Sequence, residues 1–212
     1  MSSSSDSIRQ AIIMGNVASI STEVNQLLSA GVASQQILDE QLLAGMAIVG
    51  ERFKRNEMFL PQVLMSAQAM QTAIDILKPH LAGSSEARNV QTVIIGTVKG
   101  DMHDIGKNLV RIMLIGAGFE VVDLGVNVPA QRFLDAATQH QAAVVCLSAL
   151  LSSTMNNMKE VVETFNNSDL KNTKILIGGA PVSREFSQNI GADGYAPTAP
   201  AAVELVQQFC SN

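Results

Sequence analysis

The chain has 212 residues, of which 47% are hydrophobic, only 4% are aromatic and none is Trp. Its 14 Lys and Arg against 19 Asp and Glu give a formal net charge of −5, and no basic run stands out, so nucleic acid and anionic membrane surfaces are not expected partners. No apolar stretch reaches the ~20 residues that a membrane span needs, and the Ser-rich start lacks the pattern of a signal peptide. Two Cys are too few for a disulfide framework, so we expect a cytoplasmic protein with a buried thiol at Cys146.

The first 82 residues predict a four-helix bundle. Apolar residues recur at helical spacing in four stretches, near residues 8–14, 17–28, 37–53 and 60–77. Pro61 stands at a favourable first-turn position of the last stretch. Short connections are typical of neighbouring antiparallel helices. Because the run from Gly83 to Glu86 is polar, we predict a helical domain over 1–82, a linker over 83–90 and a second domain over 91–212.

Beyond the linker, strand-like and helix-like stretches alternate. This pattern predicts a mostly parallel, doubly wound sheet, and five strands with five helices fit the flavodoxin-like α/β version. In such sheets ligands bind beyond the carboxyl ends of the strands, which directs attention to the loop after the first strand. The expected strands are 93–97, 120–124, 143–147, 174–177 and 194–196, and the expected helices are 105–115, 129–140, 155–165, 183–190 and 201–210.

The loop after the first strand runs from Gly96 to Asn108 and holds one of three His in the chain. Its glycines are too far apart for a dinucleotide fingerprint. A multi-histidine metal site would need further ligands nearby, and His80 and His140 lie elsewhere. A single axial ligand to a metal held by a macrocycle needs one His with an acidic partner, which Asp101 and His103 supply. On spacing alone, an ordinary cap or surface pair is the more frequent explanation of two such residues in a loop between a strand and a helix.

The pattern Asp-x-His-x-x-Gly at Asp101, His103 and Gly106 resembles the signature of cobalamin-binding domains. The surrounding run resembles the corrinoid-binding module of cobalamin-dependent methionine synthase and the small stand-alone corrinoid proteins of methyltransferase systems. Two further motifs of that family follow in order: Ser-x-Leu at Ser148 and Leu150 after the third strand, and a Gly pair after the fourth, at 178 and 179. Three ordered motifs at strand ends are far more specific than any one of them.

The resemblance implies a base-off cobalamin, or a related corrinoid, in which His103 is the lower axial ligand of cobalt. Asp101 is then the acceptor for the other ring nitrogen, and Thr154 supplies the hydroxyl that completes the relay, where Ser is common in the family. Ser148 and Ser152 are expected to hydrogen-bond the nucleotide tail, and Leu150 to line its channel. The cofactor-binding residues implied in this domain are Asp101, Met102, His103, Asp104, Ile105, Gly106, Ser148, Leu150, Ser152, Thr154, Gly178 and Gly179.

In the helical domain, Phe53, Met58 and Leu60 resemble the cap that covers the upper face of the cofactor in this family. A barrel for a methyl donor or a folate would need ~250 residues more. We therefore expect a methyl carrier, a non-autonomous subunit that serves a substrate-specific methyltransferase, an acceptor methyltransferase and a reductive activator protein. Two alternatives stay open: a subunit of a cobalamin-dependent mutase, which does not normally carry this cap, and a cobalamin-based sensor, which would usually add a DNA-binding module.

Overall fold

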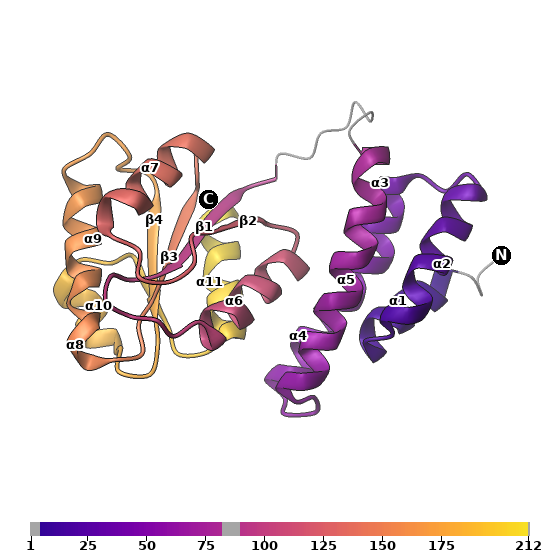
Figure 1. The fold of residues 1–212 in the computed structure, drawn as a ribbon, viewed down its shortest axis with the longest axis horizontal. Helices are drawn as coiled ribbons and strands as arrows, with labels where there is room; N and C mark the ends of the chain where they lie inside the picture. Colours follow the sequence, from indigo (N-terminus) through magenta and orange to yellow (C-terminus); the bar gives the residue numbers. More distant parts are fainter. Residues whose placement is uncertain (1–4, 82–89, 212) are drawn as a thin grey trace. The chain divides into compact units, whose positions relative to one another are not determined.

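The computed structural model describes residues 5–81 and 90–211, and within them the chain forms two compact units whose main break lies between residues 89 and 90 (Figure 1). The predicted linker, 83–90, falls outside the described residues except for Val90. The first unit is helical, and the second is an α/β sheet domain, which confirms the predicted fold class.

The helical unit consists of four rods, as predicted. One of them, the rod from Ser34 to Lys54, is continuous but not uniform, because a π-helical segment lies between two α-helical ones. The unit is held together by fully buried aliphatic side chains from all four rods, among them Ile12, Ile20, Leu42 and Leu77. The bounds are α1 Ser5–Met14, α2 Val17–Ser29, α3 Ser34–Ile37, η1 Leu38–Leu43, α4 Ala44–Lys54 and α5 Leu60–Leu81.

Helix ends in this unit follow from the local sequence. Asn16 caps α2, since its side-chain oxygen accepts a hydrogen bond from the backbone N–H of Ser19 at 3.3 Å. Pro61 is the second residue of α5, where the missing N–H costs no intrahelical hydrogen bond. No helix in the described residues is long and apolar enough to cross a membrane.

The sheet unit contains five parallel strands in the order β2-β1-β3-β4-β5, the flavodoxin-like order that the sequence predicts. Each observed strand agrees with its predicted stretch to within a residue. The strands are β1 Thr92–Thr97, β2 Glu120–Asp123, β3 Val144–Ser148, β4 Lys174–Gly178 and β5 Gly194–Ala196, and the helices are α6 Ile105–Gly116, α7 Ala130–His140, α8 Ser152–Met155, α9 Asn157–Asn166, α10 Arg184–Ile190 and α11 Ala199–Ser211.

The helix predicted over 155–165 is the one departure in this unit. The structure has two segments there, α8 and α9, and the first begins at Ser152. Leu151 is extended, and its carbonyl accepts hydrogen bonds from the N–H groups of Thr154 and Met155, so the chain turns before the apolar periodicity begins. This early turn places Thr154 one residue before the end of α8.

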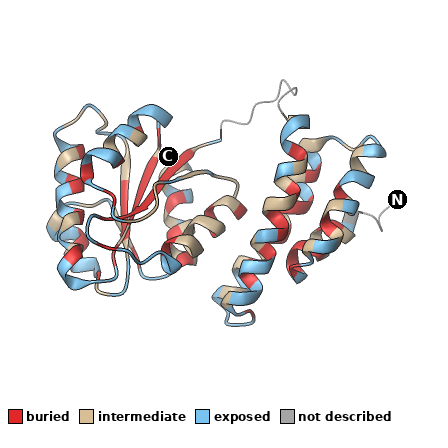
Figure 2. Cartoon of the chain, viewed as in Figure 1, coloured by how far each residue is buried: buried red, intermediate tan, exposed pale blue. Residues whose placement is uncertain are grey.

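Helices cover both faces of the sheet, and the central strands are buried between them (Figure 2). Alternate strand residues point to opposite sides: Ile94 and Val145 pack with α7, α9 and α10, while Val93 and Cys146 pack with α6 and α11. Cys146 is buried, as predicted. Because all strands run in one direction, the loops after β1, β3 and β4 meet at the same edge of the sheet.

Candidate functional site

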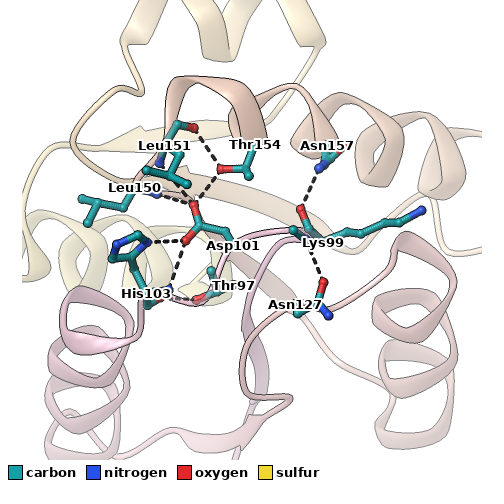
Figure 3. A network of polar contacts seen from close by, with 10 residues as sticks. Thr97, Lys99, Asp101, His103, Asn127, Leu150, Leu151, Thr154 and Asn157 are labelled. Atoms are coloured by element: carbon teal, nitrogen blue, oxygen red, sulfur yellow. Dashed lines mark hydrogen bonds and ion pairs between the residues drawn. The ribbon is translucent and has the colours of Figure 1, made fainter.

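Asp101 lies at the centre of the loop between β1 and α6, and it is fully buried (Figure 3). Its Oδ1 accepts hydrogen bonds from the backbone N–H of His103 at 3.1 Å and lies 2.7 Å from the ring atom Nδ1 of the same residue. Its Oδ2 accepts from the backbone N–H groups of Leu150 and Leu151, at 2.8 and 3.2 Å, and from the Thr154 hydroxyl at 2.6 Å. The carboxylate therefore connects the loop between β1 and α6, which contains His103, to the segment after β3.

These contacts determine the protonation state of Asp101. Burial alone would raise the pKa of this carboxyl group, because a charge is poorly solvated inside a protein. The hydrogen bonds from Thr154, Leu150 and His103 outweigh burial and hold the pKa of Asp101 well below its usual range. Asp101 is therefore an anion at neutral pH and acts as a hydrogen-bond acceptor only.

His103 takes its tautomer from this anion. With an ionised acceptor at 2.7 Å, Nδ1 keeps its proton in the neutral ring, and the lone pair is on Nε2. The side chain is 48% exposed, and among the described residues no hydrogen-bond partner faces Nε2. The Thr97 hydroxyl donates to the carbonyl of His103 at 2.8 Å and so fixes its backbone. The arrangement presents one oriented nitrogen ligand at the sheet edge.

Thr154 has a single hydroxyl proton and two acceptors within reach. Besides Asp101 Oδ2 at 2.6 Å, its Oγ1 lies 2.9 Å from the carbonyl oxygen of Leu151. The carboxylate is the shorter contact and carries a full charge, so it is the stronger acceptor. Thr154 is buried, and its extra methyl group, compared with Ser, leaves the hydroxyl in place to reach Asp101.

Exposed apolar side chains occur next to His103 in the chain and in the segment after β3 that Asp101 contacts. Met102 and Ile105, on either side in the chain, are 68% and 74% exposed, and Leu150 and Leu151 are 45% and 42% exposed. Large apolar side chains that stay exposed on two segments joined through the Asp101 carboxylate mark a surface that binds something apolar. Asp104, between them, accepts a hydrogen bond from the Asn108 side chain at 3.1 Å in the first turn of α6.

A cavity of about 350 Å³ opens beside this loop, on the sheet face that α6 and α11 cover. Ser148, Gly106, Gly178 and Gly179 are among its lining residues, together with apolar residues of β1, β3 and β4. The predicted residues Leu150 and Ser152 do not line this cavity; Ser152 is the exposed first residue of α8. The structure thus brings four of the predicted cofactor-binding residues to one concave site and leaves these two outside it.

Gly179 is required by the chain's own backbone. A Cβ there would stand 1.8 Å from the carbonyl oxygen of Ala149, and the residue has φ +131°, which side chains rarely tolerate. Gly178 also has little room for a side chain, because a Cβ there would stand 3.0 Å from the carbonyl oxygen of Ala196. The expected reason for this pair, the close approach of a ligand, is therefore not needed to explain it. A Cβ at Gly106, by contrast, would meet nothing within 4 Å, so that position faces open space.

One charged group on the cavity wall was missed by sequence analysis. Lys107 is only 3% exposed, and its Nζ contacts both carboxylate oxygens of Asp123, at 2.6 and 2.8 Å, at the end of β2. It also donates to the side-chain oxygen of Asn108 at 2.7 Å. The pair ties the start of α6 to the neighbouring strand. In the sequence, this ion pair is indicated only by a Lys that follows Gly106 and an Asp at the end of the next strand.

The predicted cap residues lie where α4 gives way to α5. Phe53 is near the end of α4 and is half-buried, Met58 is 6% exposed, and Leu60 opens α5 and is half-buried. Phe59 is the exposed member of this segment, at 70%. Within the helical unit, then, the aromatic ring most available for contact is that of Phe59 rather than Phe53.

Comparison with known proteins identifies both units as B12 binding domains: one family model matches residues 91–204 and a second matches residues 5–78. The chain is 38% identical to a corrinoid protein of Desulfitobacterium hafniense, over 96% of each chain. It is 38% identical to trimethylamine corrinoid protein 1 of Methanosarcina acetivorans, over 86% of this chain and 85% of the relative.

Its structure resembles a chain of the methanol:cobalamin methyltransferase complex MtaBC from Methanosarcina barkeri, with a TM-score of 0.89 and 30% identity, over 97% of this chain and 78% of that one. The chain belongs to the family of two-domain corrinoid proteins of methyltransferase systems, which confirms the predicted family.

Proposed function

We propose that this chain is a corrinoid-bound methyl carrier in which Nε2 of His103 is the lower axial ligand of cobalt and the cofactor's own nucleotide base is detached. The observation that carries this proposal is the buried anion behind the ring. Asp101 accepts the Nδ1 proton at 2.7 Å, so the nitrogen with the free lone pair is the one that faces outward. A surface His without such a partner would have no fixed tautomer.

The surroundings fit a corrinoid. The exposed side chains of Met102, Ile105, Leu150 and Leu151 offer an apolar surface around the His103 ring for the lower face of a macrocycle. The adjacent cavity of about 350 Å³ lies within the range of small-ligand sites and would take the detached nucleotide tail, with the Ser148 hydroxyl as a hydrogen-bonding group. Gly106 leaves open space for the tail at the start of α6.

The chain's own residues hold and orient the ligand. Asp101 remains ionised and keeps the proton of His103 on Nδ1, which makes the imidazole a better donor. Thr154 and the two amides of Leu150 and Leu151 hold Asp101 from behind. The corrinoid, when bound, would supply the chemistry of carrying a methyl group on its cobalt, and the residues named above would hold and orient it.

The helical unit, assigned to 1–82, would form a cap over the upper face of the cofactor, joined by a linker at 83–90 to the cofactor domain at 91–212. Phe53, Met58 and Leu60 are its proposed contacts, and the exposed ring of Phe59 joins them. The two family models, matching 5–78 and 91–204, support this division. A cap must move for methyl transfer, since partners reach the same face.

The relatives support a methyltransferase as a partner. Several of these are trimethylamine or dimethylamine corrinoid proteins, and a similar structure comes from a methanol:cobalamin methyltransferase complex. We infer a substrate-specific methyltransferase and an acceptor methyltransferase that uses a folate or a thiol, together with a protein that reductively reactivates the cofactor, all in the cytoplasm. The carrier alone is not an autonomous enzyme.

Reconstitution tests this proposal. Apoprotein mixed with hydroxocobalamin should retain the cofactor through gel filtration and show a base-off absorbance spectrum, and His103→Ala should retain it with an altered spectrum. His140→Ala, at the end of α7, is the matched control. The purified carrier should not demethylate methanol or methylamines until a methyltransferase is added. Failure to retain cobalamin, a spectrum that His103→Ala leaves unchanged, or normal turnover by the carrier alone would each contradict the proposal.

A further inference from the structure

Two asparagine side chains hold the backbone immediately before the relay (Figure 3). The Oδ1 atom of Asn127 accepts a hydrogen bond from the N–H of Gly100 at 2.7 Å, and its own backbone N–H donates to the carbonyl of Asp101 at 2.9 Å. On the other side, Nδ2 of Asn157 donates to the carbonyl of Lys99 at 2.6 Å. Three consecutive residues are therefore each hydrogen-bonded to one of two asparagines.

The backbone conformations explain why an asparagine suits position 127. Gly100 has φ +81° and Asn127 has φ +55°, so both residues are in the left-handed region. Asn is one of the few residues other than Gly that adopts this conformation readily. Space is not the constraint at Gly100, where a Cβ would make only an ordinary 3.5 Å contact with the Thr154 side chain. Asn127 combines conformational tolerance with a side-chain acceptor.

The two asparagines come from different elements and converge on one loop. Asn127 lies in the connection between β2 and α7, and Asn157 is the first residue of α9. The α8–α9 segment therefore contacts the loop twice: Thr154 holds the Asp101 carboxylate, and Asn157 holds the backbone two residues earlier. These two contacts join the same pair of segments, one to the side chain of Asp101 and one to the backbone before it.

We propose that Asn127 and Asn157 are positioning residues of the cobalt-ligand loop. They hold the Lys99–Asp101 backbone so that the buried carboxylate meets the Nδ1 atom of His103 and the Thr154 hydroxyl at the same time. This inference rests on the proposed axial role of His103. Neither residue is among those that line the cavity, and each acts through the placement of Asp101.

The test measures ligation rather than stability alone. Asn127→Gly keeps the left-handed backbone and removes the acceptor, and Asn157→Ala removes the donor. Each variant is loaded with hydroxocobalamin and reduced to Co(II). The ratio of His-ligated to unligated cobalt is then read by electron paramagnetic resonance, at the pH where the wild type is half ligated. Each variant should lower this ratio about threefold to tenfold, the equivalent of one neutral hydrogen bond.

Two further variants separate positioning from general stability. Asn127→Asp keeps both the acceptor and the tolerance for positive φ, so it should restore most of the ratio. Gln141→Gly alters another exposed residue with positive φ, 49°, at the end of α7, and should leave the ratio at the wild-type value. If Gln141→Gly lowers the ratio as much as the asparagine variants do, their effect is general destabilisation and the positioning role is overturned.

The outcome for the wild type distinguishes the two proposals. If wild-type protein shows no His-ligated Co(II), the proposed function fails and the positioning role fails with it. If the wild type is His-ligated and both Asn127→Gly and Asn157→Ala keep its ratio, only the positioning role is overturned.

Discussion

Asp101→Asn is the most informative single substitution in this chain, because it keeps the shape of the side chain and changes only its hydrogen-bonding pattern. In the wild type, both carboxylate oxygens accept. In the variant one oxygen becomes an NH₂ group, which must face either His103 or the amides of Leu150 and Leu151. The second orientation sets the NH₂ group against two fixed backbone donors, so we expect the first.

The cost can be worked from the contacts. With NH₂ toward His103, one backbone N–H loses its acceptor, at about 1–3 kcal/mol, and three remaining bonds lose a charged acceptor, at roughly 1 kcal/mol each. Relief of the buried charge offsets part of this loss. We expect the free energy of unfolding to fall by about 2–4 kcal/mol, so that the protein still folds.

The same orientation changes the ring. Nδ1 of His103 can accept from the new NH₂ group only in the other tautomer, which places the proton on Nε2 and blocks the proposed cobalt ligand. Urea unfolding of the apoprotein measures the first effect, and the absorbance spectrum with hydroxocobalamin measures the second. Asp135 is an exposed residue of α7 whose carboxylate accepts a hydrogen bond from Gln131, so Asp135→Asn is the control. It should change the free energy of unfolding by no more than about 0.5 kcal/mol and leave the absorbance spectrum unchanged.

The pH dependence gives an independent signature. The pKa of Asp101 in the folded protein lies below its ordinary value of 3.8, so its contribution to stability is complete above that pH and is lost as pH falls below about 4. The stability difference between wild type and Asp101→Asn should therefore narrow on acidification. A variant that is as stable as the wild type at pH 7, or a difference that widens below pH 4, would refute the reasoning.

Three other predictions follow from single contacts. Thr154→Val should destabilise the protein by about 1–3 kcal/mol in urea unfolding and weaken His ligation, whereas Thr154→Ser should behave like the wild type. Gly179→Ala should cost more than about 4 kcal/mol or prevent folding, as judged by soluble yield and circular dichroism, whereas Gly191→Ala, with φ +77° and no close atom, should cost only about 1–2 kcal/mol. Lys107→Met should cost about 1–3 kcal/mol in thermal or urea unfolding, because it removes the closer cation of the partly buried Asp123 carboxylate and leaves Arg111 Nε at 3.9 Å as the more distant one. Lys107→Met combined with Asp123→Leu should recover most of that loss.

Local patterns in the sequence were sufficient for the fold. Strand–helix alternation and helical periodicity are short-range properties, so the order β2-β1-β3-β4-β5 and the four helical rods could be predicted. The π-helical segment Leu38–Leu43 could not, because Leu, Asp, Glu and Gln also occur in ordinary α-helices and no residue of the segment marks the wider turn. The early start at Ser152 was missed for a related reason, since the turn is made by polar residues that carry no periodic signal.

The site divides in the same way. Asp101 and His103 are two residues apart, so their pairing is visible in the sequence, and Thr154 was found by its spacing from Ser148. The side chains of Asn127 and Asn157 contact backbone atoms that are 27 and 58 residues away in the chain. Such contacts leave no pattern in the sequence, so they could not be predicted from it. The same holds for the amides of Leu150 and Leu151 on Asp101, because a backbone N–H is present at almost every residue.

The most direct test of the axial role of His103 uses isotopes. Protein carrying ¹⁵N-labelled histidine is loaded with unlabelled hydroxocobalamin, reduced to Co(II) and examined by electron paramagnetic resonance. If Nε2 of His103 is the axial ligand, the superhyperfine splitting of each cobalt line should change from a triplet to a doublet on labelling, and His103→Ala should abolish it. A triplet that persists in the labelled protein would show that the cofactor's own base remains on cobalt and would contradict the account.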